Sequence, residues 1–354
     1  MAIPPTSVPD FDDLPKVENM PPGYAWGVFD RDGKKDVLGT LNFLTPDIVQ
    51  ASSKEVKDGV SISLNWSLNA MAKIPIPGRG PPEHRIDYKP DTMGSYSGIS
   101  WDDHLSFNTQ SSSQWDSLCH FQHQPSGLAY NGYKPTKDSL AAASSATSQD
   151  APTIDHWHSR GGLVARGVLI DYKAYTEDKG ISFHAFDGTS ISPADLEACA
   201  AHQGVEFRPG DVLIVRTGST QIIDHLSPEQ IQQTMGAAAL AGVEGSENTA
   251  RWLWNKRFAA VASDSNAFEV FPPVKPDGSK GSPADLGKMK YLTGIAVLHH
   301  YLLSGFGMPI GELWDLTRLS AYCREKKRYS FMLTSAPLNH PGLIGSPPNA
   351  LAIL

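Results

Sequence analysis

The sequence has few cysteines and no long apolar run, and both absences limit what the protein can be. Its 354 residues hold three widely spaced cysteines, Cys119, Cys199 and Cys323, which fit free thiols in a reducing compartment better than a disulfide framework. No stretch reaches the ~18 apolar residues that span a bilayer, and the first residues lack the basic and apolar segments of a signal peptide. We therefore expect a cytoplasmic protein with no membrane partner.

An excess of positive charge is also missing. The formal net charge is -8 and the pI is about 5.8, whereas nucleic-acid-binding domains usually carry a basic patch and a pI above ~9. The sequence likewise has no Gly-x-Gly-x-x-Gly after a strand, no Walker loop, no Gly-x-Ser-x-Gly elbow and no Cys-x-x-Cys pair. These absences argue against a nucleic-acid partner and against nucleotide-binding, α/β-hydrolase and zinc-ribbon proteins.

The order of apolar runs and helical patterns predicts an α/β fold. Apolar runs end in a polar residue or a turn, as buried strands do, and helical patterns lie between them. We expect strands at 162–171, 211–216, 258–263 and 328–333, and helices after Ser192, at 246–256, at 292–304 and near Leu313.

The first hundred residues are less regular. Residues 1–45 are rich in Pro and Asp and predict an N-terminal arm on the main body, with a mobile tail as the alternative. Alternating apolar residues at 59–68 predict a half-buried strand. The many Pro and Gly residues of 72–100, Pro75, Pro77 and Gly78 among them, predict an irregular loop that walls a pocket.

The segment from Gln110 to His120 collects two amides, a carboxylate and an imidazole within eleven positions. Asp116 and His120 are four positions apart, so on a helical turn they would share a face. A carboxylate beside an imidazole orients the ring and raises its proton affinity, so His120 could act as a general acid or base with Asp116 beside it. Alternatively, Asp116 caps a helix and His120 only forms a hydrogen bond with it.

Other residues could line the same pocket. Asp264 and Glu269 follow a predicted strand, where open α/β sheets place residues that face a ligand, although capping of a loop explains them equally well. Aromatic residues beside the first cluster suit a flat or cyclic substrate, although packing in the core explains them nearly as well; these are Tyr96, Trp101 and Trp115.

The stretch Ser113-Gln-Trp-Asp-Ser-Leu-Cys-His-Phe121 resembles the signature of the cyclase family, which includes bacterial kynurenine formamidases and isatin hydrolases. The family pattern is His-x-Gly-Thr-His-x-Asp-x-Pro-x-His-Phe. The resemblance implies that Gln110 and Gln114 stand at two metal-binding histidine positions. It also implies that Asp116 is a metal ligand and that His120 transfers protons.

A second part of the sequence extends the resemblance. The family takes a His and a Glu twelve positions apart, which here selects His300 and Glu312. The adjacent His299 falls on an apolar helical stripe and is expected to be a core histidine. Further blocks at 161–171, 210–218, 262–269 and 335–349 are similar to the fungal branch of the family.

The resemblance covers roughly residues 25–354 and implies one cyclase-like domain over 1–354. The fold of the family is a swivelling β/α/β fold, with a compact, mixed, partly barrel-like sheet ringed by helices, and its members are commonly homo-oligomers. Relatives with full histidine sets bind zinc or manganese and hydrolyse an amide. Because a Gln offers only a neutral oxygen, we expect a single, weaker divalent metal (Mn, Zn or Mg) on Asp116, His300 and Glu312, or a metal-free site.

Three functions remain open for a small-molecule substrate. The first is a hydrolase that cleaves an amide, lactam or lactone bond of a small cyclic or aromatic compound, with His120 moving the proton. The second is a metal-independent cyclase, dehydratase or isomerase of secondary metabolism that uses the same pocket. The third is a non-catalytic small-molecule binding protein.

Overall fold

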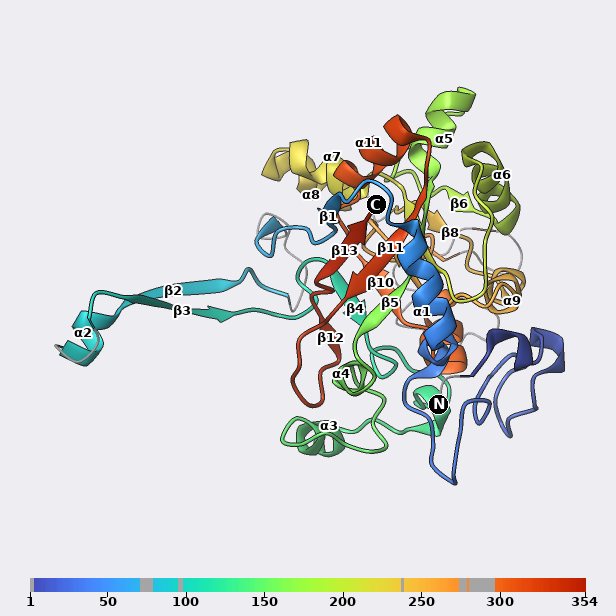
Figure 1. The fold of residues 1–354 in the computed structure, drawn as a ribbon, viewed down its shortest axis with the longest axis horizontal. Helices are drawn as coiled ribbons and strands as arrows, with labels where there is room; N and C mark the ends of the chain where they lie inside the picture. Colours follow the sequence, from blue (N-terminus) through green and yellow to red (C-terminus); the bar gives the residue numbers. More distant parts are fainter. Residues whose placement is uncertain (1–2, 71–78, 95–97, 237–238, 274–278, 280–296) are drawn as a thin grey trace.

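The structure, a computed structural model, describes residues 3–70, 79–94, 98–236, 239–273, 279 and 297–354. In these residues nine strands form one mixed sheet that curls into a half-barrel with helices around it (Figure 1). From edge to edge the strands run in the order β1, β13, β11, β5, β7, β9, β10, β4 and β12. Their bounds are β1 Ser61–Ser63, β4 Gln114–Asp116, β5 Leu163–Asp171, β7 Val212–Arg216, β9 Ala260–Ser263, β10 Ile310–Glu312, β11 Ser330–Ser335, β12 Gly345–Ser346 and β13 Ala350–Ile353. The expected α/β class with a partly barrel-like sheet is confirmed.

The centre of the sheet is parallel and buried on both faces. Strands β5, β7, β9 and β10 pair in parallel, and the strands on either side of them pair antiparallel. Successive side chains of one strand enter opposite core clusters, as Val168 and Leu169 of β5 do. A strand covered on both faces is mostly apolar, which is why the apolar runs predicted β5, β7 and β9 correctly.

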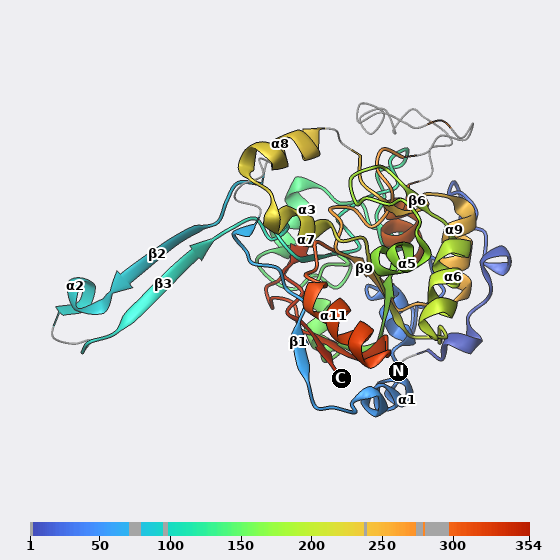
Figure 2. The same cartoon turned by 90° about the horizontal axis from the view of Figure 1, so that it is seen from above.

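Helices cover both faces of the sheet (Figure 2). Helices α5, α6 and α9 place their buried residues in one core cluster, and α1 and α11 pack against the other. The predicted start after Ser192 is confirmed, because its side chain accepts a hydrogen bond from the backbone N–H of Asp195 in the first turn of α6. The helix bounds are α1 Pro46–Ser52, α3 Lys137–Ala143, α4 His156–Ser159, α5 Tyr172–Lys179, α6 Pro193–Gln203, α7 Ser219–His225, α8 Pro228–Gly236, α9 Glu247–Asn255 and α11 Thr317–Lys326.

The N-terminal segment lies against the main body. The guanidinium group of Arg257 donates hydrogen bonds to the carbonyl oxygens of Pro5 and Val8. Gly39 has a φ of +58°, and a Cβ built on it would lie 1.9 Å from the carbonyl oxygen of Gly307. Only glycine fits this close approach of two backbones. Among the described residues, no helix is long and apolar enough to cross a bilayer.

A β-hairpin replaces part of the irregular loop expected at 72–100. Strand β2 Glu83–Tyr88 pairs with β3 Trp101–Ser106, the short helix α2 Lys89–Met93 follows β2, and the ribbon extends away from the body (Figures 1 and 2). The prediction was wrong for this stretch because 83–88 contains no Pro or Gly, although its surroundings are rich in both. Pro75, Pro77 and Gly78 lie outside the described residues.

The sequence placed two helices near the C-terminus imperfectly. The first five positions of the helix expected at 292–304 lie outside the described residues, and the chain winds as a π-helix over His300–Phe306. Leu313 directly follows β10, and the helix expected near it, α11, begins at Thr317.

Besides the hairpin, β6 Ser190–Ile191 and β8 Gly242–Val243 form another two-stranded sheet in the described part of the chain.

Candidate active site

Two paired strands present the first side chains of the site. In the antiparallel pair of β4 and β10, Gln114 lies opposite Glu312 and Asp116 lies opposite Ile310. Alternate residues of a strand share a face, so the side chains of Gln114, Asp116 and Glu312 project to the same side. The residue between them, Trp115, must project to the other side.

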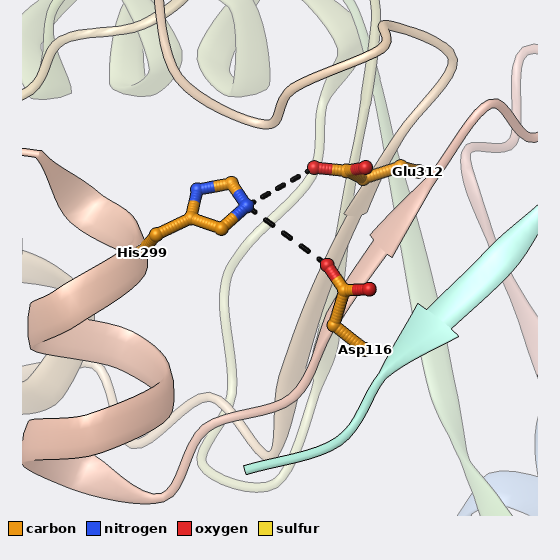
Figure 3. Close-up of side chains that lie close together, drawn as sticks. All are labelled: Asp116, His299 and Glu312. Carbon is orange, nitrogen blue, oxygen red and sulfur yellow. Dashed lines mark ion pairs between the residues drawn. The ribbon is translucent and has the colours of Figure 1, made fainter. Parts of the chain in front are cut away.

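His299 meets these carboxylates from the helix in front of the sheet (Figure 3). Its Nε2 lies 3.2 Å from Oε1 of Glu312 and 3.9 Å from Oδ2 of Asp116. Its Nδ1 lies 2.7 Å from Oε2 of Glu269, and its backbone N–H donates to the other oxygen of that carboxylate. Glu269 therefore fixes the ring with Nε2 directed at Asp116 and Glu312.

The structure corrects the choice of His300, which does not meet the two carboxylates. Its ring lies beside Tyr301, with the ring centroids 4.4 Å apart, and near His123 at 6.3 Å. The helical stripe that assigned His299 to the core assumed α-helical spacing, whereas residues 300–306 form a π-helix with hydrogen bonds from i to i+5. His299 takes the place expected for His300.

The donor set formed by Asp116, His299 and Glu312 fits a divalent cation. One ligand atom from each of the three buried residues lies within 4.8 Å of the others. Oδ2 of Asp116 and the amide oxygen of Gln114 are buried without a hydrogen-bond partner, and a buried carboxylate oxygen with no partner is costly. The Glu269 carboxylate on the far nitrogen of His299 is the arrangement that orients metal-binding histidines.

His120 lies beside this cluster with Gln110 between them. The side-chain nitrogen of Gln110 donates a hydrogen bond to Oδ1 of Asp116 at 2.8 Å and lies 3.1 Å from Nδ1 of His120. Nε2 of His120 is 4.0 Å from Oδ2 of Asp116. The two residues are close as expected, but through the end of β4 and the turn after it rather than through a helix.

Burial and charge set the protonation of the cluster. Burial lowers the pKa of His299, but Glu269 and Glu312 outweigh this effect and hold that pKa well above its usual value. Burial raises the pKa of Glu269, but His299 outweighs it and lowers this pKa. Burial, together with the charge of Asp116, raises the pKa of Glu312 to about 7. Burial lowers the pKa of His120, so its ring is neutral near neutral pH.

A cavity of about 340 Å³ opens onto the cluster. His120, Glu269, His299 and Glu312 form its polar wall, and Arg79 adds a guanidinium group whose charge lowers the pKa of His120. The remaining wall is mostly apolar: Phe121, Asn266, Ala267, Val270, Phe271, Pro273 and Val297. The sequence reasoning missed Arg79, because it stands in the Pro- and Gly-rich stretch where no motif marks it.

Several expected pocket residues do not line this cavity. Trp115 is fully buried on the opposite side of β4, packed against Trp314 at 4.9 Å. Asp264 accepts hydrogen bonds from the backbone N–H groups of Thr217 and Gly218 and joins the ends of two strands. Trp101 is exposed on the hairpin. The contacts of Asp264 agree with the alternative interpretation, in which it caps a loop. Tyr96 lies outside the described residues.

Comparison with known proteins is informative about the fold. Residues 45–270 match the model of a family described as "Putative cyclase", whereas no curated protein matches the chain. The structure is similar to the crystal structure of a novel cyclase, with a TM-score of 0.73 and 28% identity over 94% of this chain and 99% of that one.

Two isatin hydrolases share the fold at lower identity. Isatin hydrolase A from Labrenzia aggregata, solved bound to benzyl benzoate, matches with a TM-score of 0.52 and 13% identity over 85% of this chain and 94% of its own. Isatin hydrolase A from Ralstonia solanacearum matches with a TM-score of 0.52 and 14% identity over 87% of this chain and 97% of its own. The likeness extends over most of each chain, so the sheet and its surrounding helices are common to them.

Proposed function

This chain belongs to the cyclase family, and from that premise we propose that it is a hydrolase that opens an amide, lactam or lactone bond of a small cyclic or aromatic substrate. One observation carries the proposal: the three possible cation ligands, with a carboxylate oxygen that has no hydrogen bond, lie beside the imidazole of His120 at the same cavity. The apolar wall suits a ring, and the neighbours named isatin hydrolases share the fold.

We propose that Asp116, His299 and Glu312 hold one divalent cation, with Glu269 orienting the histidine. Two carboxylates and one imidazole suit manganese, zinc or magnesium. When bound, such an ion supplies a Lewis acid that polarises the scissile carbonyl. Gln110 and Gln114 donate hydrogen bonds to Asp116 and Glu312, so they support the carboxylates rather than adding ligand nitrogens.

His120 moves the proton in this proposal. Its Nδ1 faces an amide N–H group of Gln110, and the neutral ring can take a proton from the water that attacks the carbonyl. As the carbon–nitrogen or carbon–oxygen bond breaks, His120 returns that proton to the leaving atom. The product carries a carboxylate, and Arg79 is the guanidinium group in the cavity wall that can pair with it.

The test is turnover of a panel of ring substrates by wild type and His120→Gln. Isatin, an N-formyl anilide and dihydrocoumarin represent the lactam, amide and lactone classes. We expect wild type to open at least one of them and His120→Gln to lower kcat by roughly 10²–10⁴-fold, with the melting temperature unchanged. Wild-type activity that His120→Gln retains in full would contradict the role given to His120.

One observation favours the second candidate function, a metal-independent cyclase, dehydratase or isomerase. The amide groups of Gln110 and Gln114 and the imidazole of His299 already supply donors to the carboxylates of Asp116 and Glu312. Full turnover of the same panel after exhaustive chelation would favour it over the hydrolase with a metal ion. Binding of the panel without any turnover would favour a non-catalytic binding protein.

A further inference from the structure

The wall of the active-site cavity contains an amide oxygen that forms no hydrogen bond. Asn266 lines the cavity beside the candidate cation site, and its Oδ1 atom is buried without a hydrogen-bond partner. A buried carbonyl oxygen in this state destabilises the folded protein, and most buried polar groups of native proteins are paired. The oxygen of Asn266 therefore indicates a ligand that brings a hydrogen-bond donor to it.

The carboxylates on the same wall already have donors. Oε1 of Glu269 accepts a hydrogen bond from the backbone N–H of His299, and Oε2 lies 2.7 Å from Nδ1 of that ring. Oε2 of Glu312 accepts a hydrogen bond from the side chain of Gln114 at 2.7 Å, and Oε1 lies 3.2 Å from Nε2 of His299. Among the described side chains that line the cavity, Asn266 is thus the one with a buried oxygen that no donor reaches.

Hydrogen bonds fix the loop on both sides of Asn266. Before it, the carboxylate of Asp264 accepts hydrogen bonds from two backbone N–H groups. The carbonyl oxygen of Ser265 accepts one from the N–H of Leu313 at 3.0 Å. After it, the carbonyl oxygen of Phe268 accepts one from β8 at 3.0 Å. An acceptor on a fixed loop is preorganised, so a ligand binds to it without the cost of ordering the loop.

We propose that Asn266 selects the substrate by accepting a hydrogen bond from an N–H group next to the scissile carbonyl. This inference rests on the proposed function and narrows it, because the substrate is then a secondary amide or lactam rather than a lactone. A lactone has an oxygen in place of the N–H group, and the lone pairs of that oxygen would face Oδ1 of Asn266. A site built to bind an N–H group rejects an analogue without one, because its buried acceptor stays unpaired.

The same hydrogen bond orients the nitrogen for the reaction. A water molecule adds its oxygen to the carbonyl carbon and gives one proton to His120, and His120 gives this proton to the nitrogen as the carbon–nitrogen bond breaks. The products are a carboxylic acid and a primary amine, whose original hydrogen is still bonded to Asn266. Because the nitrogen is held through that hydrogen, its lone pair keeps one direction toward the incoming proton. Asn266 itself moves no proton.

The experiment measures the binding of two ligands of the same shape by isothermal titration. Oxindole is a lactam with an N–H group, and 2-indanone has a CH₂ group in its place. The quantity compared is the Kd of 2-indanone divided by the Kd of oxindole. We expect this ratio to fall at least roughly 10-fold from wild type to Asn266→Leu, which is similar in size and has no acceptor. Asn266→Asp, which keeps the acceptor, should retain the wild-type ratio.

The matched control is Val297→Ala, which changes the apolar wall of the same cavity. It should weaken both ligands equally and leave the ratio unchanged. A ratio that Asn266→Leu retains, a ratio that Asn266→Asp loses, or a wild type that binds neither ligand would each overturn the inference. A lower melting temperature of Asn266→Leu would overturn it too, because the side chain would then serve the fold.

Binding and turnover separate this inference from the proposed function. If the ratio depends on Asn266 but no compound of the substrate panel is opened, the hydrolase is contradicted, whereas the recognition of an N–H group by Asn266 stands. If isatin and dihydrocoumarin are both opened and the ratio does not depend on Asn266, the hydrolase stands and the selection by Asn266 is contradicted.

Discussion

At the scale of single residues, the site is defined by how each carboxylate oxygen is used. Oδ1 of Asp116 accepts a hydrogen bond from Gln110, whereas Oδ2 has no hydrogen-bond partner and faces the rings of His120 and His299 at 4.0 and 3.9 Å. A buried anion is stable only when it is paired or binds a metal. Oδ2 of Asp116, which has no hydrogen bond, is therefore the atom at which a cation stabilises the folded protein most.

The two glutamines beside the candidate cation site bear on how strongly it binds a metal. The side chains of Gln110 and Gln114 both donate hydrogen bonds to carboxylates. An amide oxygen is a neutral, hard ligand. We therefore expect zinc to bind more weakly than it would at a site with histidines at these two positions.

Arg79 is expected to recognise the carboxylate of the product. Benzoate imitates an aromatic product, and a hydrogen bond to a charged group contributes about 1.5–3 kcal/mol. Arg79→Met should therefore raise the Kd of benzoate by roughly 10–100-fold in isothermal titration. Arg79→Lys, which keeps the charge, should lose less of its affinity for benzoate. In both variants, the affinity for the neutral benzamide should not change. Equal weakening of both ligands by Arg79→Met would show that the residue only shapes the cavity.

At the scale of the elements, alternation along short strands decides which side chains reach the cavity. The paired strands β4 and β10 direct Asp116 and Glu312 to one side and Trp115 to the other. This separation could have been read from the sequence, because neighbouring strand residues face opposite sides. A helical turn at 110–120, in which a spacing of four aligns two side chains, does not predict this separation.

Other elements could not have been read from local sequence. His299, directly before the π-helix at 300–306, faces Asp116 and Glu312, and no periodicity in the sequence marks such a winding. The hairpin of β2 and β3 stands outside the core, so it lacks the buried-strand pattern that identified β5, β7 and β9. The longer interior strands are thus predictable because burial dictates their composition, whereas three-residue strands such as β4 and β10 and peripheral elements are not.

Asp211, just before β7, gives a pH dependence of stability. It is 2% exposed, and its carboxylate accepts a hydrogen bond from the backbone N–H of Arg208. Burial raises its pKa to about 7, although Arg166 opposes the change. Because an unfolded aspartate has a pKa of about 3.9, the folded state holds this proton more tightly. Its stabilising contribution is therefore complete below about pH 4 and is lost as the pH rises to about 7.

The substitution Asp211→Asn places a neutral amide at this position, so the loss of stability with rising pH is removed. Between about pH 5 and about pH 8, the melting temperature of Asp211→Asn should rise relative to wild type by at least roughly 2 °C. Asp150→Asn, which alters an exposed carboxyl group, should follow wild type at every pH. Melting curves of Asp211→Asn that shift with pH in parallel to wild type would contradict the burial of a protonated Asp211.

At the scale of the whole molecule, the site exists only because distant segments converge on one cavity. Arg79 precedes the hairpin, His120 follows β4, and Glu269 follows β9. His299 precedes β10, and Glu312 is the last residue of that strand. The family resemblance predicted most of this convergence, since it linked Asp116 and His120 to a histidine and Glu312. It pointed to His300, whereas the structure places His299 beside the two carboxylates.

The adjacent histidines allow the most direct test of the account, which is the titration of metal-stripped protein with Mn²⁺ followed by electron paramagnetic resonance. We expect wild type and His300→Gln to bind a single Mn²⁺ per chain. His299→Gln should keep its fold, checked by its melting temperature, and lose at least ~100-fold in affinity, since removing a ligand costs no less than removing its orienting partner. Absence of binding in wild type, or a loss in His300→Gln that His299→Gln does not share, would contradict the account.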